Sequence, residues 1–148
     1  DLTADIWDRV METNLRAPFL LARAAAKLLK ASDGGHIVNI SSAGGIGPGS
    51  SSIAYSSSKA GLYHLTRSLA VAMSPEVAVN CIAPGFVENT RMAARLPDNV
   101  AQDARQTAVL GRVGQAEDIA NQTLAFVQST SITGQTMVID GGMPGAMR

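Results

Sequence analysis

The six residues HIVNIS, 36–41, are the clearest structural signal in the sequence. They are short, mostly apolar and β-branched, and they lie between glycines and serines, which is typical of a buried strand. VAVNCIA at 77–83 has the same character and stops at Pro84-Gly85. QTMVID at 135–140 stops at Gly141-Gly142. We expect these three segments to be strands of one sheet.

Helical periodicity fills the segments between the strands. The expected helices cover 6–30, 53–73, 90–109 (one or two short helices, with Pro97 between them) and 116–127. Pro18 should bend or locally loosen the first of these helices. Strands that alternate with helices predict parallel pairing with right-handed crossovers. The fold class is therefore α/β, and residues 1–148 form one unit.

Composition excludes several classes of function. The chain has 148 residues, of which 46% are hydrophobic and 16% charged, so it can bury a core. Twelve basic and twelve acidic side chains give zero net charge, which makes nucleic acid and membrane surfaces poor partners. The longest apolar run, 17–29, contains Arg23 and Lys27 and is too short to span a bilayer. The lone Cys81 fits a reducing compartment, so we expect a cytoplasmic protein.

Polar residues gather where the predicted sheet would bind a ligand. In open parallel sheets, ligands lie beyond the carboxyl ends of the strands. Ser41 and Ser42 follow the first predicted strand, and Tyr55 begins the helix that leaves the next loop. Lys59 lies one helical turn after Tyr55 and faces the same way. His36 and His64 have no metal-like spacing with other ligands, so no metal site is expected.

This group of side chains suits proton transfer. A free tyrosine has a pKa of about 10 and is a poor acid at neutral pH. A nearby ammonium favours the phenolate, which helps a phenol to exchange a proton with a carbonyl or alcohol oxygen. A serine hydroxyl can hold the same oxygen. The hydride must come from a cofactor, because no side chain supplies one.

Five stretches together resemble the short-chain dehydrogenase/reductase family, in its ordinary single-domain branch. They are NLRAPFLLARAA (14–25), IVNISS (37–42), YSSSKAGL (55–62), VNCIAPGFVENT (79–90) and ITGQTMVIDGG (132–142). They follow the family's order and cover nearly the whole chain. Within the family, the chain is similar to 3-oxoacyl-(acyl-carrier-protein) reductases. The resemblance implies a Rossmann-like parallel sheet with flanking helices.

The resemblance implies four catalytic residues. Tyr55 would be the general acid and base, and Lys59 would make its phenol more acidic. Ser42 would hold the substrate oxygen, so that Ser42 and Tyr55 bind the substrate, with Ser41 as the second choice. Asn14 would hold a water in the proton relay. Ser42 could instead bond only the backbone of its serine-rich loop.

The resemblance also implies a nicotinamide cofactor, NAD or NADP. Its contacts would be Tyr55, Lys59, Pro84, Gly85, Val87 and Thr90. Lys59 would bind the ribose hydroxyls, and the Pro84-Gly85 turn would line the nicotinamide. Thr90 lies one residue further from this turn than in the commonest pattern of the family. The three-residue gap between Tyr55 and Lys59 favours carbonyl or alcohol chemistry over double-bond reduction.

The family's glycine-rich turn, which holds the pyrophosphate of the cofactor, is absent. We therefore expect this chain to be the C-terminal portion of the fold, without its first strands. The resemblance implies a homodimer or homotetramer built through helices 6–30 and 53–73. The alternative function is a non-catalytic oligomerisation or interaction module without cofactor. The expected substrate is a small-molecule carbonyl or alcohol, such as a hydrophobic ketone or acyl thioester, between 43–52 and 90–109.

Overall fold

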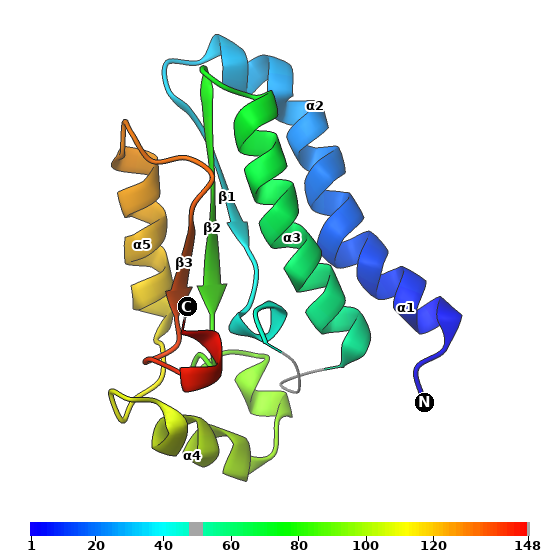
Figure 1. The fold of residues 1–148 in the computed structure, drawn as a ribbon, viewed down its shortest axis with the longest axis vertical. Coiled ribbons are helices and arrows are strands. Elements are labelled where there is room, and N and C mark those ends of the chain that lie inside the picture. Colours follow the sequence, from blue (N-terminus) through cyan, green and yellow to red (C-terminus); the bar gives the residue numbers. More distant parts are fainter. Residues whose placement is uncertain (48–51, 148) are drawn as a thin grey trace.

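In residues 1–47 and 52–147, which the computed structural model describes, the chain forms a three-stranded parallel sheet with helices on both faces (Figure 1). The strands are β1 (Gly35–Ile40), β2 (Val77–Pro84) and β3 (Thr136–Ile139), and they lie in the order β1-β2-β3. Each lies within a residue or so of its predicted range. The predicted α/β class and parallel pairing are therefore confirmed.

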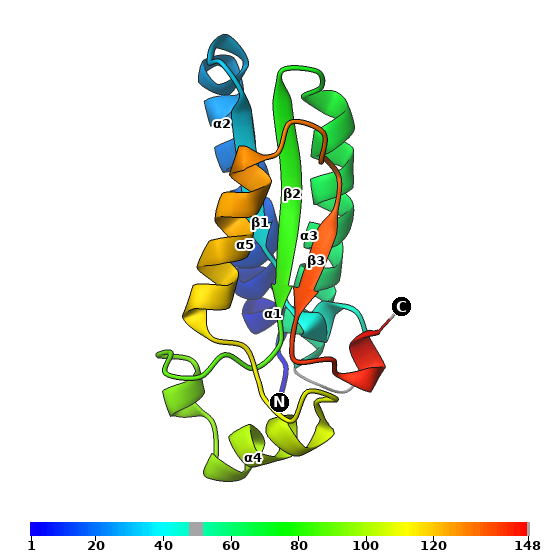
Figure 2. The same cartoon turned by 90° about the vertical axis from the view of Figure 1, so that its left-hand side faces the viewer.

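The helices form two layers around the sheet. They are α1 (Ala4–Met11), α2 (Ala17–Ala31), α3 (Ile53–Ala72), α4 (Asp98–Thr107) and α5 (Ala116–Gln128), with short 3-10 helices at Ala43–Gly45, Ala93–Arg95 and Pro144–Ala146. In Figure 2, α5 lies in front of the sheet, whereas α1, α2 and α3 lie behind it. Among the described residues, no helix is long and apolar enough to cross a membrane.

The first predicted helix is continuous in space but changes its hydrogen bonding. A π-helical turn, Glu12–Arg16, separates α1 from α2. Pro18 lies at the start of α2 and has no N–H, so it cannot donate to the carbonyl of Asn14 four residues earlier. The N–H of Ala17 instead reaches back five residues to the carbonyl of Glu12. The irregularity expected at Pro18 thus falls on the turn before it, which contains Asn14.

The main hydrophobic core lies between α3 and the sheet. Its buried members are Ala70, Met73, Val77 and Val79, with Ala26, Leu29, Ile37 and Leu69 packed against them. The buried side of α3 repeats every four residues, at Ala54, Ser58, Leu62, Thr66 and Ala70. Burial of Leu62 alone contributes roughly 1.5–3 kcal/mol by its apolar area. This stripe fixes the rotation of α3 and so the direction of its other faces.

The parallel strands end at one edge of the sheet. Ile40 of β1 pairs with Ile82 of β2, and Pro84 of β2 pairs with Ile139 of β3. The N-terminal end of α3 lies at this same edge (Figure 1). The residues that follow the three strands therefore lie at the same edge of the sheet as the first turns of α3, and parallel α/β sheets bind ligands at this edge.

Candidate active site

Tyr55 and Lys59 occupy successive turns at the start of α3. Ser52 caps this helix, and its side-chain oxygen accepts a hydrogen bond from the N–H of Tyr55 at 3.3 Å. Lys59 follows one turn later, and its Nζ lies 5.7 Å from the centroid of the Tyr55 ring. This distance is within the range of a cation–π contact. The ammonium and the phenol ring are therefore neighbours in the folded chain.

Lys59 is held in place by the end of β1. Its Nζ donates a hydrogen bond to the carbonyl oxygen of Ile40 at 2.9 Å. Partial burial lowers the pKa of Lys59, because desolvation disfavours the ammonium. An ammonium carries three N–H donors, and this contact occupies one of them. Within residues 1–47 and 52–147, its other two donors have no hydrogen-bond acceptor and could serve a ligand at the edge of the sheet.

The two serines after β1 have different tasks. The hydroxyl of Ser41 is buried and donates to the carbonyl oxygen of Lys59 at 2.8 Å, so its proton is committed to the scaffold. The hydroxyl of Ser42 accepts from the N–H of Gly44 at 3.1 Å. Its own proton has no acceptor within the described part of the chain. Of the two serines, Ser42 is the one that can still donate to a substrate oxygen.

Asn14 reaches α3 from the neighbouring helix. It lies in the π-helical turn, and its Nδ2 donates to the Oγ of Ser58 at 3.1 Å. The same Oγ donates to the carbonyl oxygen of Tyr55 at 2.7 Å. Asn14 is thus joined to the turn that carries Tyr55 and Lys59. Ser58 thus links Asn14 to the backbone of Tyr55, and Lys59 joins them through its contact with the Tyr55 ring.

The Pro84-Gly85 turn is shaped by the close approach of β3. The N–H of Gly85 donates to the carbonyl oxygen of Ile139 at 2.8 Å. A Cβ at Gly85 would lie 2.5 Å from the Cβ of Asp140, which is too close for any side chain. Two residues further on, Val87 forms a parallel bridge with Gly114. The backbone of this turn is therefore fixed, and its position depends on a residue without a side chain.

Thr90 uses its hydroxyl within its own loop. Its Oγ1 donates to the carbonyl oxygen of Val87 at 3.0 Å and accepts from the N–H of Ala93 at 3.1 Å. The contact with Ala93 ties Thr90 to the first residue of the 3-10 helix Ala93–Arg95. The hydroxyl proton of Thr90 is therefore donated within its own loop. Any ligand contact by Thr90 would have to use its remaining acceptor capacity or its methyl group.

A family model described as "Enoyl-(Acyl carrier protein) reductase" matches residues 1–144. Curated relatives include the 3-oxoacyl-(acyl-carrier-protein) reductase of Aquifex aeolicus, which is 37% identical over 140 residues. The chain belongs to the short-chain dehydrogenase/reductase family. The same reductase of Rickettsia bellii is 39% identical over 140 residues. These alignments cover 93% of this chain in both cases, but 56% of the Aquifex protein and 58% of the Rickettsia protein.

Solved structures of the family superpose on the fold. A 3-oxoacyl-(acyl-carrier-protein) reductase from Brucella melitensis matches with a TM-score of 0.90 at 29% identity, covering 100% of this chain and 56% of that one. A 7α-hydroxysteroid dehydrogenase in complex with NADH and 7-oxo glycochenodeoxycholic acid matches with a TM-score of 0.89 at 28% identity, covering 97% of this chain and 57% of that one. The chain spans little more than half the length of these relatives.

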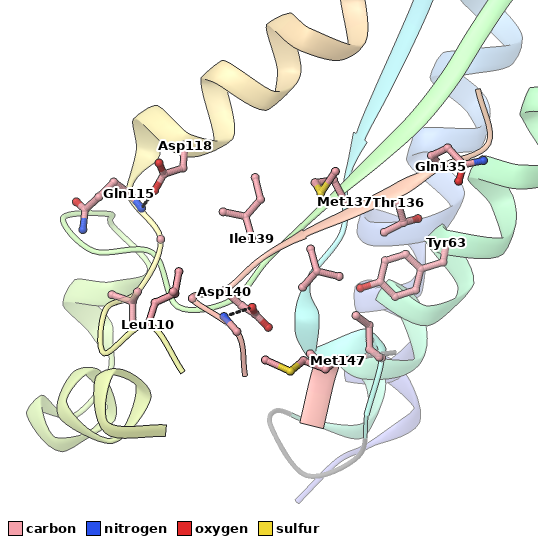
Figure 3. Close-up of a pocket in the computed structure, with 18 of the residues that line it drawn as sticks. Tyr63, Leu110, Gln115, Asp118, Gln135, Thr136, Met137, Ile139, Asp140 and Met147 are labelled. Carbon is pink, nitrogen blue, oxygen red and sulfur yellow. Dashed lines mark hydrogen bonds between the residues drawn. The ribbon is translucent and has the colours of Figure 1, made fainter. Parts of the chain in front are cut away.

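A large hollow lies along β3 and the middle of α3 (Figure 3). It is an open groove of about 1270 Å³ that runs along β3, and its lining includes Tyr63, Thr136, Met137 and Asp140. Tyr55, Lys59 and Ser42 do not line it. This groove therefore does not coincide with the predicted catalytic residues, and their assignment rests on their own contacts.

Two residues of the site were missed by sequence reasoning. Tyr63 donates its phenol proton to the carbonyl oxygen of Ser42 and so supports the backbone that carries the serine hydroxyl. Burial raises the pKa of Tyr63 to about 12, and hydrogen bonds to Ser41 and Ser42 offset part of this rise. Ser58 joins Asn14 to Tyr55. The available signal was spacing, because Tyr55, Lys59 and Tyr63 follow one another at four-residue intervals on α3.

Proposed function

We propose that this chain carries the proton-transfer site of an NAD(P)-dependent oxidoreductase that interconverts a carbonyl and a secondary alcohol. One observation carries the proposal. The ammonium of Lys59 lies beside the ring of Tyr55, at the edge of the sheet where Ser42 keeps an undonated hydroxyl proton. A cation next to a phenol and a hydroxyl donor form a group suited to a reacting oxygen.

In the reducing direction, each side chain has one task. The hydroxyl of Ser42 donates to the carbonyl oxygen and fixes its position. The phenol of Tyr55 gives its proton to that oxygen while the carbonyl carbon receives the hydride. The ammonium of Lys59 then stabilises the phenolate that remains. In the oxidising direction, the phenolate takes the proton of the alcohol as the hydride leaves, so protons and electrons balance both ways.

The residues at this edge fit a nicotinamide cofactor, which supplies or accepts the hydride when bound. After its bond to Ile40, Lys59 has two N–H donors without a partner in the described part of the chain, and these suit the ribose hydroxyls. We assign Tyr55 and the backbone of Pro84, Gly85 and Val87, with Thr90, to the nicotinamide side of the site. Asn14 would hold a water of the proton relay. The preference between NAD and NADP stays open in this proposal.

We propose a hydrophobic carbonyl compound as substrate. Met92 and Leu96 follow the Pro84-Gly85 turn and expose 64% and 42% of their surface, which gives that wall of the site an apolar character. The opposite wall was predicted at 43–52, of which 48–51 lie outside the described residues. The names of the relatives, 3-oxoacyl reductases and a hydroxysteroid dehydrogenase, agree with a bulky apolar ketone, alcohol or acyl thioester.

We further propose that a second copy of the chain packs on α1, α2 and α3. A groove of about 640 Å³ between these helices is lined by Met11, Leu15, Phe19 and Leu65 among others. Gly61 permits this close packing, since a Cβ there would lie 2.9 Å from the Cδ2 of Leu15. Phe19 still exposes 42% of its surface, so part of the apolar face is open to a partner.

The unpaired, buried Cys81 accords with a cytoplasmic location.

The proposal is tested by titration and turnover of the full-length protein. We expect saturable quenching or shift of NADH or NADPH fluorescence, followed by oxidation of the preferred cofactor on addition of a 3-oxoacyl thioester or a hydrophobic ketone. A matched enoyl thioester should not be reduced, because the pair acts on oxygen. Absence of both cofactor binding and oxidation, in a folded oligomer, would favour the interaction module and overturn the proposal.

A further inference from the structure

Ser58 is the only polar member, besides Thr66, of the buried stripe of α3 in the described part of the chain. It is completely buried, three residues after Tyr55 and directly before Lys59. A buried hydroxyl is costly unless its hydrogen bonds are made. Thr66 meets this need with Asn39 at 2.9 Å and with its own helix. Ser58 meets it with Asn14, which lies 44 residues away along the chain.

The two bonds of Ser58 fix the orientation of the Asn14 amide. A hydroxyl has one proton, and Ser58 spends it on the carbonyl oxygen of Tyr55 at 2.7 Å. Its oxygen can therefore only accept from Asn14. The NH₂ group of Asn14 must face Ser58, at 3.1 Å, and the amide oxygen must face away. Ser58 thus selects one of the two flips of the amide, which differ in hydrogen bonding although their shapes are nearly the same.

The turn that carries Asn14 lacks the usual α-helical bonding. It is π-helical, and Pro18 removes the N–H that would meet the carbonyl of Asn14. π-helical turns are rare and have poorer intrinsic hydrogen bonding than the α-helix. A side-chain bond to the neighbouring helix can therefore decide the position of such a turn. Asn14 to Ser58 is the side-chain hydrogen bond that joins this turn to α3 in the described residues.

We infer that Ser58 is a positioning residue for the proposed reaction. Ser58 couples Asn14, on its π-helical turn, to Tyr55 and Lys59 on α3. The inference rests on the proposed function. Ser58 does not touch the reacting atoms. Its hydroxyl sets the orientation of the Asn14 amide and ties it to the first turns of α3, so that the two parts of the proton relay keep one geometry.

A double-mutant cycle on the full-length enzyme tests the coupling. Ser58→Ala should lower kcat about tenfold, the factor expected from one lost hydrogen bond of ordinary strength, with less than about twofold change in the KM for the carbonyl substrate. In the Asn14→Ala background, the same substitution should cost less than about twofold, because its partner is already gone. Ser57→Ala is the matched control, since the half-buried Ser57 makes no side-chain hydrogen bond in the described part of the chain.

Each outcome bears on the inference. An unchanged kcat in Ser58→Ala, a change in KM alone, or an equal loss in both backgrounds would overturn it and leave Ser58 a packing residue. Side-chain amide exchange in the unmodified protein gives a readout that does not need activity. The Asn14 amide protons should exchange more slowly than those of the exposed Asn121, and equal rates would also overturn the inference. Absence of carbonyl turnover in the unmodified enzyme would instead reject the proposed function, while the exchange rates would still report on the Asn14–Ser58 bond.

Discussion

The two sides of the sheet edge are built by different means. On the α3 side, side chains bond to distant backbone: Lys59 to Ile40, Ser41 to Lys59, and Tyr63 to Ser42. On the Pro84-Gly85 side, backbone bonds to backbone, and the missing side chain of Gly85 allows the close approach. Substitutions of side chains on the α3 side should therefore lower activity and leave the fold intact. Added side-chain bulk on the Pro84-Gly85 side should instead lower stability.

Among the changes that separate the two sides, the largest effect is expected when the cation of the α3 side is removed. Lys59→Met should lower kcat by about 10² or more, because the phenolate loses its neighbouring charge. The melting temperature should stay the same or rise, since desolvation already disfavours the charged Lys59. Because its pKa is lowered, the activity of the unmodified enzyme should decline on the alkaline side before the ordinary lysine value of 10.5. Steady-state rates and thermal melts check both expectations.

Two controls sharpen the Lys59 experiment. Lys27→Met, on the exposed face of α2, should leave kcat unchanged. Lys59→Arg keeps the charge and should recover part of the rate. A Lys59→Met variant that keeps the activity of the parent while Lys27→Met does the same would show that the ammonium has no part in the reaction.

The next largest effect concerns stability on the Pro84-Gly85 side. Gly85→Ala would place a Cβ 2.5 Å from the Cβ of Asp140 and 3.0 Å from its Cα, so the turn or β3 must shift. We expect a loss of about 1–3 kcal/mol in the free energy of unfolding, as for other overpacked sites. Denaturant titration measures it. Gly145→Ala is the control, because nothing lies within 4 Å of a Cβ there, and an equal loss in both variants would contradict the contact.

A smaller effect, confined to alkaline pH, is expected from Tyr63. Its pKa is raised from 10.0 to about 12, so the folded state favours the neutral phenol. This contribution to stability is complete below pH 10 and is lost as the pH rises toward about 12. The difference in unfolding free energy between the parent and Tyr63→Phe should therefore shrink over that range. Parallel pH curves for the two proteins would show that the Tyr63 phenol titrates no differently in the folded and unfolded states.

The smallest effect should come from the charges next to the Pro84-Gly85 turn. Glu88 accepts hydrogen bonds from Gln115 and Arg105, and these lower its pKa, the bond from Gln115 first. Its contribution to stability is present above the ordinary value of 4.5 and is lost as the pH falls through the lowered value. Glu88→Gln should be slightly less stable at neutral pH, and the difference should vanish in acid. A difference that persists unchanged in acid would mean that the carboxylate charge is not its source.

Much of the fold followed from sequence because its signals are local. Apolar, β-branched runs between glycines or serines gave β1, β2 and β3, and helical periodicity gave α3 and α5. The π-helical turn did not follow, since Pro18 predicts an irregularity but not its register. The resemblance to a family was confirmed by the match over residues 1–144. The assigned roles of Asn14, Ser42, Tyr55 and Lys59 stay predictions.

The parts of the site that escaped prediction depend on long-range contacts. Nothing local to Ser58 indicates a partner 44 residues earlier, and the sequence alone left Ser41 and Ser42 as alternatives. The structure separates the two serines by the direction of their hydroxyl bonds. Gly85 was noted as a turn residue, but its contact with Asp140 depends on how β3 lies beside β2. Spacing along a helix shows from the sequence which residues share a face. Contacts between separate elements can be identified only once the fold is known.

The most direct measurement compares two tyrosines of one helix. Tyr55→Phe and Tyr63→Phe each remove a phenol oxygen from α3, and carbonyl reduction by the full-length enzyme is followed at saturating NADH or NADPH. We expect Tyr55→Phe to lose about 10²–10⁴ in kcat with cofactor affinity retained, whereas Tyr63→Phe should stay within about tenfold of the parent. A Tyr55→Phe variant with near-parental kcat would contradict the assignment of Tyr55 as the proton donor.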